Sequence, residues 1–142
     1  VRSCVGIGSM LMHGIGDTIR VSLTGDSLAE IETGKRILSS LGLKKDGPTI
    51  VSCPTCGRCR IPLIRMAEEV RRRTSHITEP IKIAVMGCAV NGPGEASDAD
   101  FGIAGGAEQG LIFKKGKILK TLPSDCLVDS LIEEISSSTK IK

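Results

Sequence analysis

Aromatic side chains are almost absent from this chain: among 142 residues, Phe101 and Phe113 are the only ones, and Trp and Tyr do not occur. Proteins that bind single-stranded nucleic acids stack the bases on aromatic rings. That mode of recognition is therefore excluded, and we expect no nucleic-acid partner. The hydrophobic content of 40% is enough for a packed core, which must be aliphatic. The length predicts one domain, or one domain with a fragment of another.

Long apolar runs are also missing. No stretch of roughly 18 apolar residues occurs, so we expect no membrane-spanning helix, and no charged-then-apolar leader opens the chain. The sequence starts at Val1, without Met, in a segment that already reads as structured, which indicates a piece of a longer protein. The six cysteines form a cluster with scattered singles rather than an even framework. That usage favours thiols that serve a metal in a reducing compartment, the cytoplasm.

The net charge indicates little about the partners of this protein, because it is only +3. The densest basic run is Arg71-Arg72-Arg73, at the end of an expected helix. Cations at a helix C-terminus interact favourably with the helix dipole, so a solvated helix end is the first interpretation. A docking patch for an acidic partner is the second.

Residues 18–24 alternate strictly between apolar and polar side chains. This pattern predicts a strand whose polar face carries Arg20 and Ser22 and could receive an anion. A capping box at Ser27–Glu30 then predicts a helix that ends before Gly42. Such a strand–helix pair is typical of an α/β barrel or of a doubly wound sheet.

The best domain boundary is the turn-rich segment 44–48, which divides the chain into residues 1–45 and 46–142. The second part reads as α/β. Pro62 is expected to open one helix and Ser124 to cap the last one. The expected strands cover residues 49–52, 81–87, 101–104, 111–113 and 117–122, the last two as a hairpin.

Two segments carry the chemistry. SCPTCGRC holds Cys53, Cys56 and Cys59, and GCAVNGPGEA holds Cys88 and Glu95. Cys53, Cys56 and Cys88 offer three soft ligands, and Glu95 offers one hard, displaceable ligand. This combination suits a metal centre that binds substrate. Glu95 could instead be an exposed loop carboxylate. The glycines around it favour the first interpretation, because they let backbone N–H groups approach a cluster or a substrate.

Three metal centres fit these thiols. A zinc ribbon needs a second paired-cysteine knuckle, whereas a single Cys88 follows here. A ferredoxin-like electron-transfer centre would combine Cys59 with both thiols of the CPTC turn, and Cys88 would close an all-cysteine shell. An open centre would use the CPTC thiols and Cys88, leaving one iron for Glu95 or for substrate. The residues alone leave the three open.

The strings SCPTCGR, GCAVNGPGEA, GIAGG and GIGDTIRVSL resemble the family of 4-hydroxy-3-methylbut-2-enyl diphosphate synthases over essentially the whole chain. The resemblance implies a TIM barrel followed by an α/β domain related to sulfite reductase modules, which holds a [4Fe–4S] cluster. Residues 1–45 would then be the last strand–helix unit of the barrel with the segment before it. Residues 46–142 would be the cluster-binding domain.

The resemblance also implies roles for individual residues. Three of the thiols would be the iron ligands: Cys53, Cys56 and Cys88. Glu95 would cap the fourth iron and take part in catalysis, and Asn91 would contact the substrate. Arg20 and Ser22 would bind the diphosphate, in agreement with the polar face on which the alternation places them. The family pattern does not require Cys59, which we interpret as a spare thiol.

The implied reaction converts 2-C-methyl-D-erythritol 2,4-cyclodiphosphate into (E)-4-hydroxy-3-methylbut-2-enyl diphosphate by two-electron reductive ring opening. The electron donor would be flavodoxin or ferredoxin. Each active site would combine the barrel of one subunit of a homodimer with the cluster domain of the other. We therefore expect this piece of the protein to bind the cluster but not to turn over alone.

Overall fold

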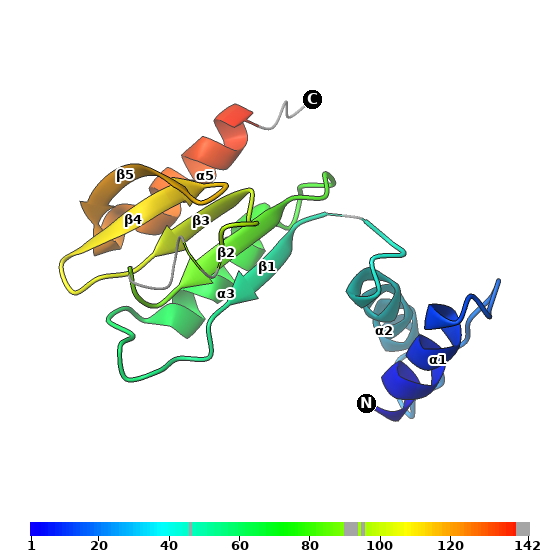
Figure 1. The fold of residues 1–142 in the computed structure, drawn as a ribbon. Coiled ribbons are helices and arrows are strands. Elements are labelled where there is room, and N and C mark those ends of the chain that lie inside the picture. Colours follow the sequence, from blue (N-terminus) through cyan, green and yellow to red (C-terminus); the bar gives the residue numbers. More distant parts are fainter. Residues whose placement is uncertain (46, 90–93, 95, 139–142) are drawn as a thin grey trace. The chain divides into compact units, whose positions relative to one another are not determined.

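The structure is a computed structural model that describes residues 1–45, 47–89, 94 and 96–138. The chain forms two compact units, Val1–Asp46 and Gly47–Lys142 (Figure 1). We describe each unit by itself. Within the described ranges, no helix is both long and apolar enough to cross a membrane.

The first unit holds two helices, α1 (Arg2–Met12) and α2 (Ser27–Ser40), which contact each other. The sequence did not predict α1. Gly6 and Gly8 lower the intrinsic helix propensity of this segment, so its helicity depends on packing, and Gly8 is buried. No charged side chain supports either end of α1, because its first turn holds no acid and its last turn no base.

Helix α2 was predicted, but its N-cap is one residue earlier than expected. The Asp26 carboxylate, and not the Ser27 hydroxyl, accepts the hydrogen bond from the Leu28 amide at 3.0 Å. Glu30 accepts from the Leu23 amide at 2.8 Å instead of closing a box with Ser27. Both residue types cap helices well, so the competition between neighbours decides the site.

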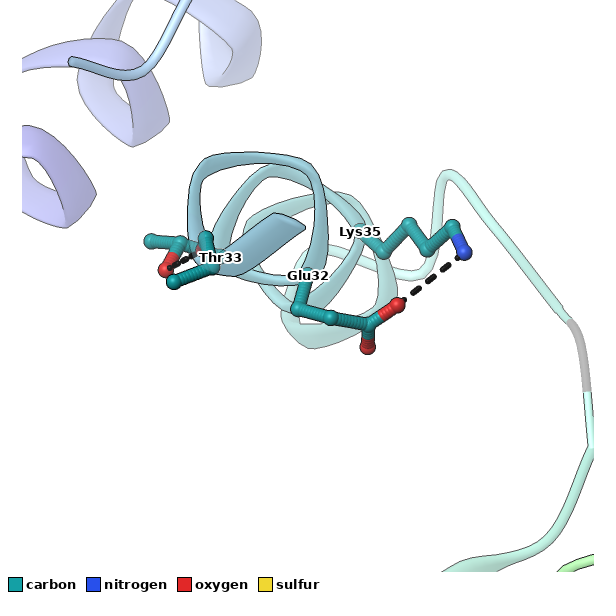
Figure 2. A network of polar contacts seen from close by, with 4 residues as sticks. Glu32, Thr33 and Lys35 are labelled. Carbon is teal, nitrogen blue, oxygen red and sulfur yellow. Dashed lines mark hydrogen bonds and ion pairs between the residues drawn. The ribbon is translucent and has the colours of Figure 1, made fainter. Parts of the chain in front are cut away.

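The end of α2 confirms the glycine signal. Gly42 has φ +70°, and the Leu43 amide donates to the Leu38 carbonyl at 3.0 Å, as in a Schellman motif. Along the exposed surface of α2, Lys35 pairs with Glu32 at 3.1 Å (Figure 2). An exposed pair of this kind contributes about 0.3–0.5 kcal/mol.

The strand predicted over residues 18–24 is absent. A strand needs a neighbour that completes its backbone hydrogen bonds, and the described part of the first unit offers none. The predicted separation of apolar and polar side chains is confirmed in part. Ile19 and Val21 lie against Gly34 of α2, whereas Arg20 and Ser22 are exposed. Leu23 was expected on the apolar face, but its side chain is exposed.

The second unit is built on a mixed five-stranded sheet in the order β1-β2-β3-β4-β5. The first three strands are parallel, and the last two continue the sheet antiparallel. The strands are β1 (Thr49–Ser52), β2 (Lys82–Met86), β3 (Phe101–Ala104), β4 (Gln109–Lys114) and β5 (Lys117–Pro123). The α/β class and the hairpin are therefore confirmed.

Helices α3 (Leu63–Thr74) and α5 (Leu127–Ser138) pack on the sheet and on each other (Figure 1). The larger core lies beneath them and is aliphatic apart from Phe101, as predicted. The smaller cluster includes Ala84, Met86, Ala104 and Phe113. Because strand residues alternate between faces, these side chains and those under the helices lie on opposite faces of the sheet.

The caps of the two helices differ from expectation. Pro62 is the N-cap of α3 and not its first helical residue. Ser124 does not cap α5: it begins a 3₁₀ turn, η1 (Ser124–Cys126), and its hydroxyl donates to the Gly106 carbonyl at 2.9 Å. That bond fastens the chain after β5 to the β3–β4 loop.

The three arginines at the end of α3 differ in their contacts. Arg71 and Arg72 are exposed, as expected for a solvated helix end. Arg73 pairs with Asp129 of α5 and also lies 3.7 Å from Glu69. One of the three arginines therefore ties the two covering helices together.

Candidate metal centre

Two of the predicted ligands follow neighbouring parallel strands. Cys53 comes directly after Ser52 at the end of β1, and Cys88 comes two residues after Met86 at the end of β2. Ser52 is in register with Val85, so the two strands end at nearly the same level. The carboxyl ends of parallel strands meet at one edge of the sheet, which is where ligands of α/β sheets commonly bind.

The backbone of Gly87 joins the two cysteine segments. Its amide donates to the Cys53 sulfur at 3.3 Å, and its carbonyl accepts from the Arg60 amide at 3.1 Å. The cysteine loop, residues 53–60, is therefore hydrogen-bonded near both of its ends to Gly87, the residue that precedes Cys88. Sequence reasoning did not single out Gly87, although a glycine directly before a predicted ligand, Cys88, was the available signal.

A side chain at Gly87 would collide with the thiols. A Cβ there would fall 2.6 Å from the Cys59 sulfur and 3.4 Å from the Cys53 sulfur. The first separation is too short for a normal contact, so the loop as folded requires glycine at this position. The sulfurs of Cys53 and Cys59 thus both lie beside the same glycine.

The loop between β1 and α3 is shaped by local backbone geometry. Thr55 has φ +35°, a left-handed conformation that is uncommon for a residue other than glycine. The Cys59 amide then donates to the Cys56 carbonyl at 2.9 Å, which closes a turn. The Cys59 thiol donates to the Ile61 carbonyl at 3.3 Å.

The four thiols at this edge differ in exposure. Cys56 is exposed, Cys53 and Cys59 are half-buried, and Cys88 is buried. The backbone N–H of Arg58 lowers the pKa of the Cys56 thiol below its usual range, and the positive charge of the Arg58 guanidinium contributes to the same shift. A lowered pKa favours the thiolate, which is the form that binds metals.

Asn91 and Glu95, both predicted to act at this site, lie outside the described residues. The chain beyond them is firmly attached to the start of β2. The Lys82 amide donates to Asp100 at 2.9 Å, and the Lys82 ammonium pairs with Asp98. That ammonium lowers the pKa of the Asp98 carboxyl, chiefly through the hydrogen bond it donates.

Arg20 and Ser22 belong to the first unit, and both are exposed. Arg20 lines a hollow of about 370 Å³ together with Lys35 and Glu30. Arg20 and Lys35 would attract an anion there, whereas Glu30 at the same hollow and Glu32, the ion-pair partner of Lys35, oppose one.

Among the described residues, no three Cys, His, Asp or Glu side chains are gathered closely enough to hold a metal ion. The donor set nevertheless fits an iron–sulfur cluster. Soft thiols from two strand ends share one edge, a glycine leaves room beside them, and an N–H group already points at one sulfur. Cluster sulfurs are stabilised by N–H donors of this kind.

Comparison with known proteins is consistent with this geometry. Residues 49–137 match the family described as GcpE protein C-terminal domain, and residues 1–35 match the GcpE TIM-barrel domain. Relatives of this chain include proteins named 4-hydroxy-3-methylbut-2-en-1-yl diphosphate synthase (flavodoxin). The protein of Caldanaerobacter subterraneus subsp. tengcongensis is 57% identical over 140 residues, which are 99% of this chain and 39% of that protein.

The protein of Ruminiclostridium cellulolyticum is 57% identical over 136 residues, 96% of this chain and 38% of that protein. The protein of Thermodesulfovibrio yellowstonii is 55% identical over 135 residues, 95% of this chain and 39% of that protein. The chain thus spans about two fifths of the length of these relatives. The resemblance found in the motifs is confirmed, and the chain belongs to the GcpE family, with that family's C-terminal domain and part of its TIM-barrel domain.

Proposed function

We propose that this chain is the cluster-bearing part of a 4-hydroxy-3-methylbut-2-en-1-yl diphosphate synthase. The complete enzyme would open the ring of 2-C-methyl-D-erythritol 2,4-cyclodiphosphate with two electrons and release one oxygen as water. The observation that carries the proposal is the bond between Cys53 and Gly87, which brings the CPTC turn to the residue before Cys88. The names of relatives at 55–57% identity support the same reaction.

The cofactor we propose is a [4Fe–4S] cluster held by Cys53, Cys56 and Cys88, with Glu95 at the remaining iron. When bound, the cluster would pass the two electrons from the donor protein to the substrate one at a time and would offer a Lewis-acidic iron. The chain's own contribution at this position is the Gly87 amide. An N–H donor to a ligating sulfur raises the reduction potential of a cluster, which eases its reduction by the donor protein.

The remaining roles concern substrate. Arg20 and Ser22 would hold the diphosphate through charge-assisted hydrogen bonds. Asn91 would orient the substrate through its amide. Once released from the iron, the Glu95 carboxyl group would donate a proton to the departing oxygen as a general acid.

The assembly we propose follows from the two units. Residues 1–45 would complete a TIM barrel, and residues 46–142 would form a sulfite-reductase-like cluster domain. Two chains would form a homodimer in the cytoplasm, with each cluster domain serving the partner's barrel. Flavodoxin would be the electron donor, as the names of the relatives suggest, and ferredoxin would be the other candidate.

One observation favours a second function. Because the Cys59 sulfur lies beside Gly87, as the Cys53 sulfur does, Cys59 could join Cys53, Cys56 and Cys88 in a closed, all-cysteine cluster. Such a centre would transfer electrons without binding substrate. Replacing Cys59 by Ser separates the two ideas: a closed cluster loses iron, whereas the open centre keeps it.

The enzyme proposal is tested by Glu95→Gln in the full-length protein. The variant should bind as much iron as the parent after anaerobic reconstitution but should not turn over. Glu108→Gln is the matched control, because Glu108 is an exposed loop residue outside the predicted site, and it should retain full activity. Full activity of Glu95→Gln would remove Glu95 from the reaction.

A further inference from the structure

Cys59 lies in the loop between β1 and α3, and the proposed cluster does not use its thiol. Its sulfur nevertheless lies near Gly87, as does the sulfur of Cys53, which the cluster needs. The Cys59 sulfur lies 2.6 Å from the position of a Cβ on Gly87, and the Cys53 sulfur lies 3.4 Å from the same point. The two sulfurs are therefore no farther apart than the sum of these distances. Both side chains also pack against the larger core, which limits how far they can separate.

The hydrogen bonds orient the pair. The Cys59 proton points to the Ile61 carbonyl, which leaves the lone pairs of its sulfur free. The sulfur of Cys53 accepts a hydrogen bond from the Gly87 amide. A disulfide would require the Cys59 side chain to turn away from Ile61, and Gly87 offers no side chain as an obstacle.

From this geometry we propose that Cys53 and Cys59 form a reversible disulfide when the protein holds no cluster. A low-molecular-weight disulfide such as oxidised glutathione is the oxidant. One protein thiolate attacks it, forming a mixed disulfide and releasing one reduced thiol. The second protein thiolate then displaces the other reduced thiol. One sulfur–sulfur bond forms as another breaks, and the protein loses two protons and two electrons.

The consequence for cluster assembly rests on the proposed function, although the bridge itself does not. A disulfide sulfur cannot serve as a thiolate ligand, so the bridge and the cluster exclude each other at Cys53. The bridge also protects Cys53 from sulfinic and sulfonic acids, which thiol reductants do not reverse. Cys59 would thus be a resolving thiol that keeps an empty site recoverable.

The first experiment locates the bridge. Full-length protein is freed of iron by chelation under anaerobic conditions, equilibrated across a series of reduced and oxidised glutathione mixtures, alkylated and mapped by peptide mass spectrometry. We expect a Cys53–Cys59 linkage in most molecules at the oxidised end and its loss at the reduced end. Free Cys53 throughout the series, or a linkage of Cys56 to either thiol as the main product, would overturn the proposal.

The second experiment measures recovery. Wild type, Cys59→Ser and the control Cys126→Ser, whose thiol is exposed in η1, are exposed as iron-free protein to glutathione disulfide with peroxide. They are then reduced. After reduction, peptide maps of wild type and Cys126→Ser should show Cys53 mainly as a free thiol, and Cys59→Ser should show a several-fold larger fraction of Cys53 as sulfinic or sulfonic acid. Equal recovery of free Cys53 in all three proteins would contradict the protective role.

Iron uptake before any exposure distinguishes the alternatives. Loss of iron from unexposed Cys59→Ser would make Cys59 a ligand and overturn its assignment as a resolving thiol. A wild-type protein that binds no iron would contradict the proposed function instead, and the peptide map would still decide whether the bridge forms.

Discussion

The Gly87 amide donates to the sulfur of Cys53 at 3.3 Å, across 34 positions of the sequence. This bond gives the cysteine loop a fixed position relative to the end of β2. Because Cys88 follows Gly87 directly, the same contact limits the distance between the two cysteine segments. The site is therefore partly organised by the fold of the protein itself.

Gly87→Ala should destabilise the iron-free protein by about 1–3 kcal/mol, because the added methyl group overpacks the two thiols. The measurement is the free energy of unfolding in urea. Gly57→Ala is the control in the same loop, since a Cβ there meets nothing within 4 Å, and it should change stability by no more than about 0.5 kcal/mol. Equal effects of the two substitutions would show that Gly87 is not confined by the sulfurs.

Gly102 is confined by an aromatic ring. It is in register with Phe113, and a Cβ on Gly102 would fall 2.2 Å from that ring. Gly102→Ala should therefore cost about 1–3 kcal/mol, and the cost should shrink in a Phe113→Leu background, which removes the obstructing ring. A double-mutant cycle by urea unfolding measures this coupling. Additive effects would mean that the ring does not occupy the space above Gly102.

Two exposed thiols should differ in reactivity. The Arg58 N–H lowers the pKa of Cys56, whereas the Asp125 charge raises the pKa of Cys126. At neutral pH a larger fraction of Cys56 is thiolate, so iodoacetamide should alkylate Cys56 faster in iron-free protein. Peptide mapping at short reaction times checks the order. Faster modification of Cys126 would contradict the assignment.

Asp98 should titrate below its usual range, because Lys82 donates to its carboxylate. A carboxyl group whose pKa is lowered by folding contributes stability that is present above its unfolded pKa. This contribution disappears as the pH falls through the folded pKa. NMR titration of Asp98 should show its pKa rising towards the usual range of an aspartate in Lys82→Met. An unchanged titration in that variant would separate Asp98 from Lys82.

Much of the second unit could be predicted from the sequence, because its signals are local. Buried strands such as β2 carry continuous apolar runs. The hairpin turn is formed by two neighbouring residues with positive φ, Lys115 and Gly116. The cap assignments failed where a neighbour or a distant carbonyl competed, as at Asp26 and at Ser124. Propensity alone does not decide such competitions.

The sequence motifs name the candidate ligands, whose role stays a prediction, but they do not name the contacts that support those residues. The motif supplied Cys53, Cys56 and Cys88, whereas the contact of Cys53 with Gly87 is long-range and has no local pattern. The strand predicted around Arg20 failed for a related reason, because its backbone partners are not supplied by nearby sequence. Helix α1 depends on packing against α2 and was missed.

The central claim is that the thiols of the CPTC turn and Cys88 hold one iron–sulfur cluster while Cys59 does not. Iron and sulfide analysis with EPR on anaerobically reconstituted protein tests it most directly. Wild type and Cys59→Ser should each contain one [4Fe–4S] cluster per chain, and Cys53→Ser, Cys56→Ser and Cys88→Ser should lose most of their iron. Zinc in place of iron, or loss of iron from Cys59→Ser alone, would contradict the account.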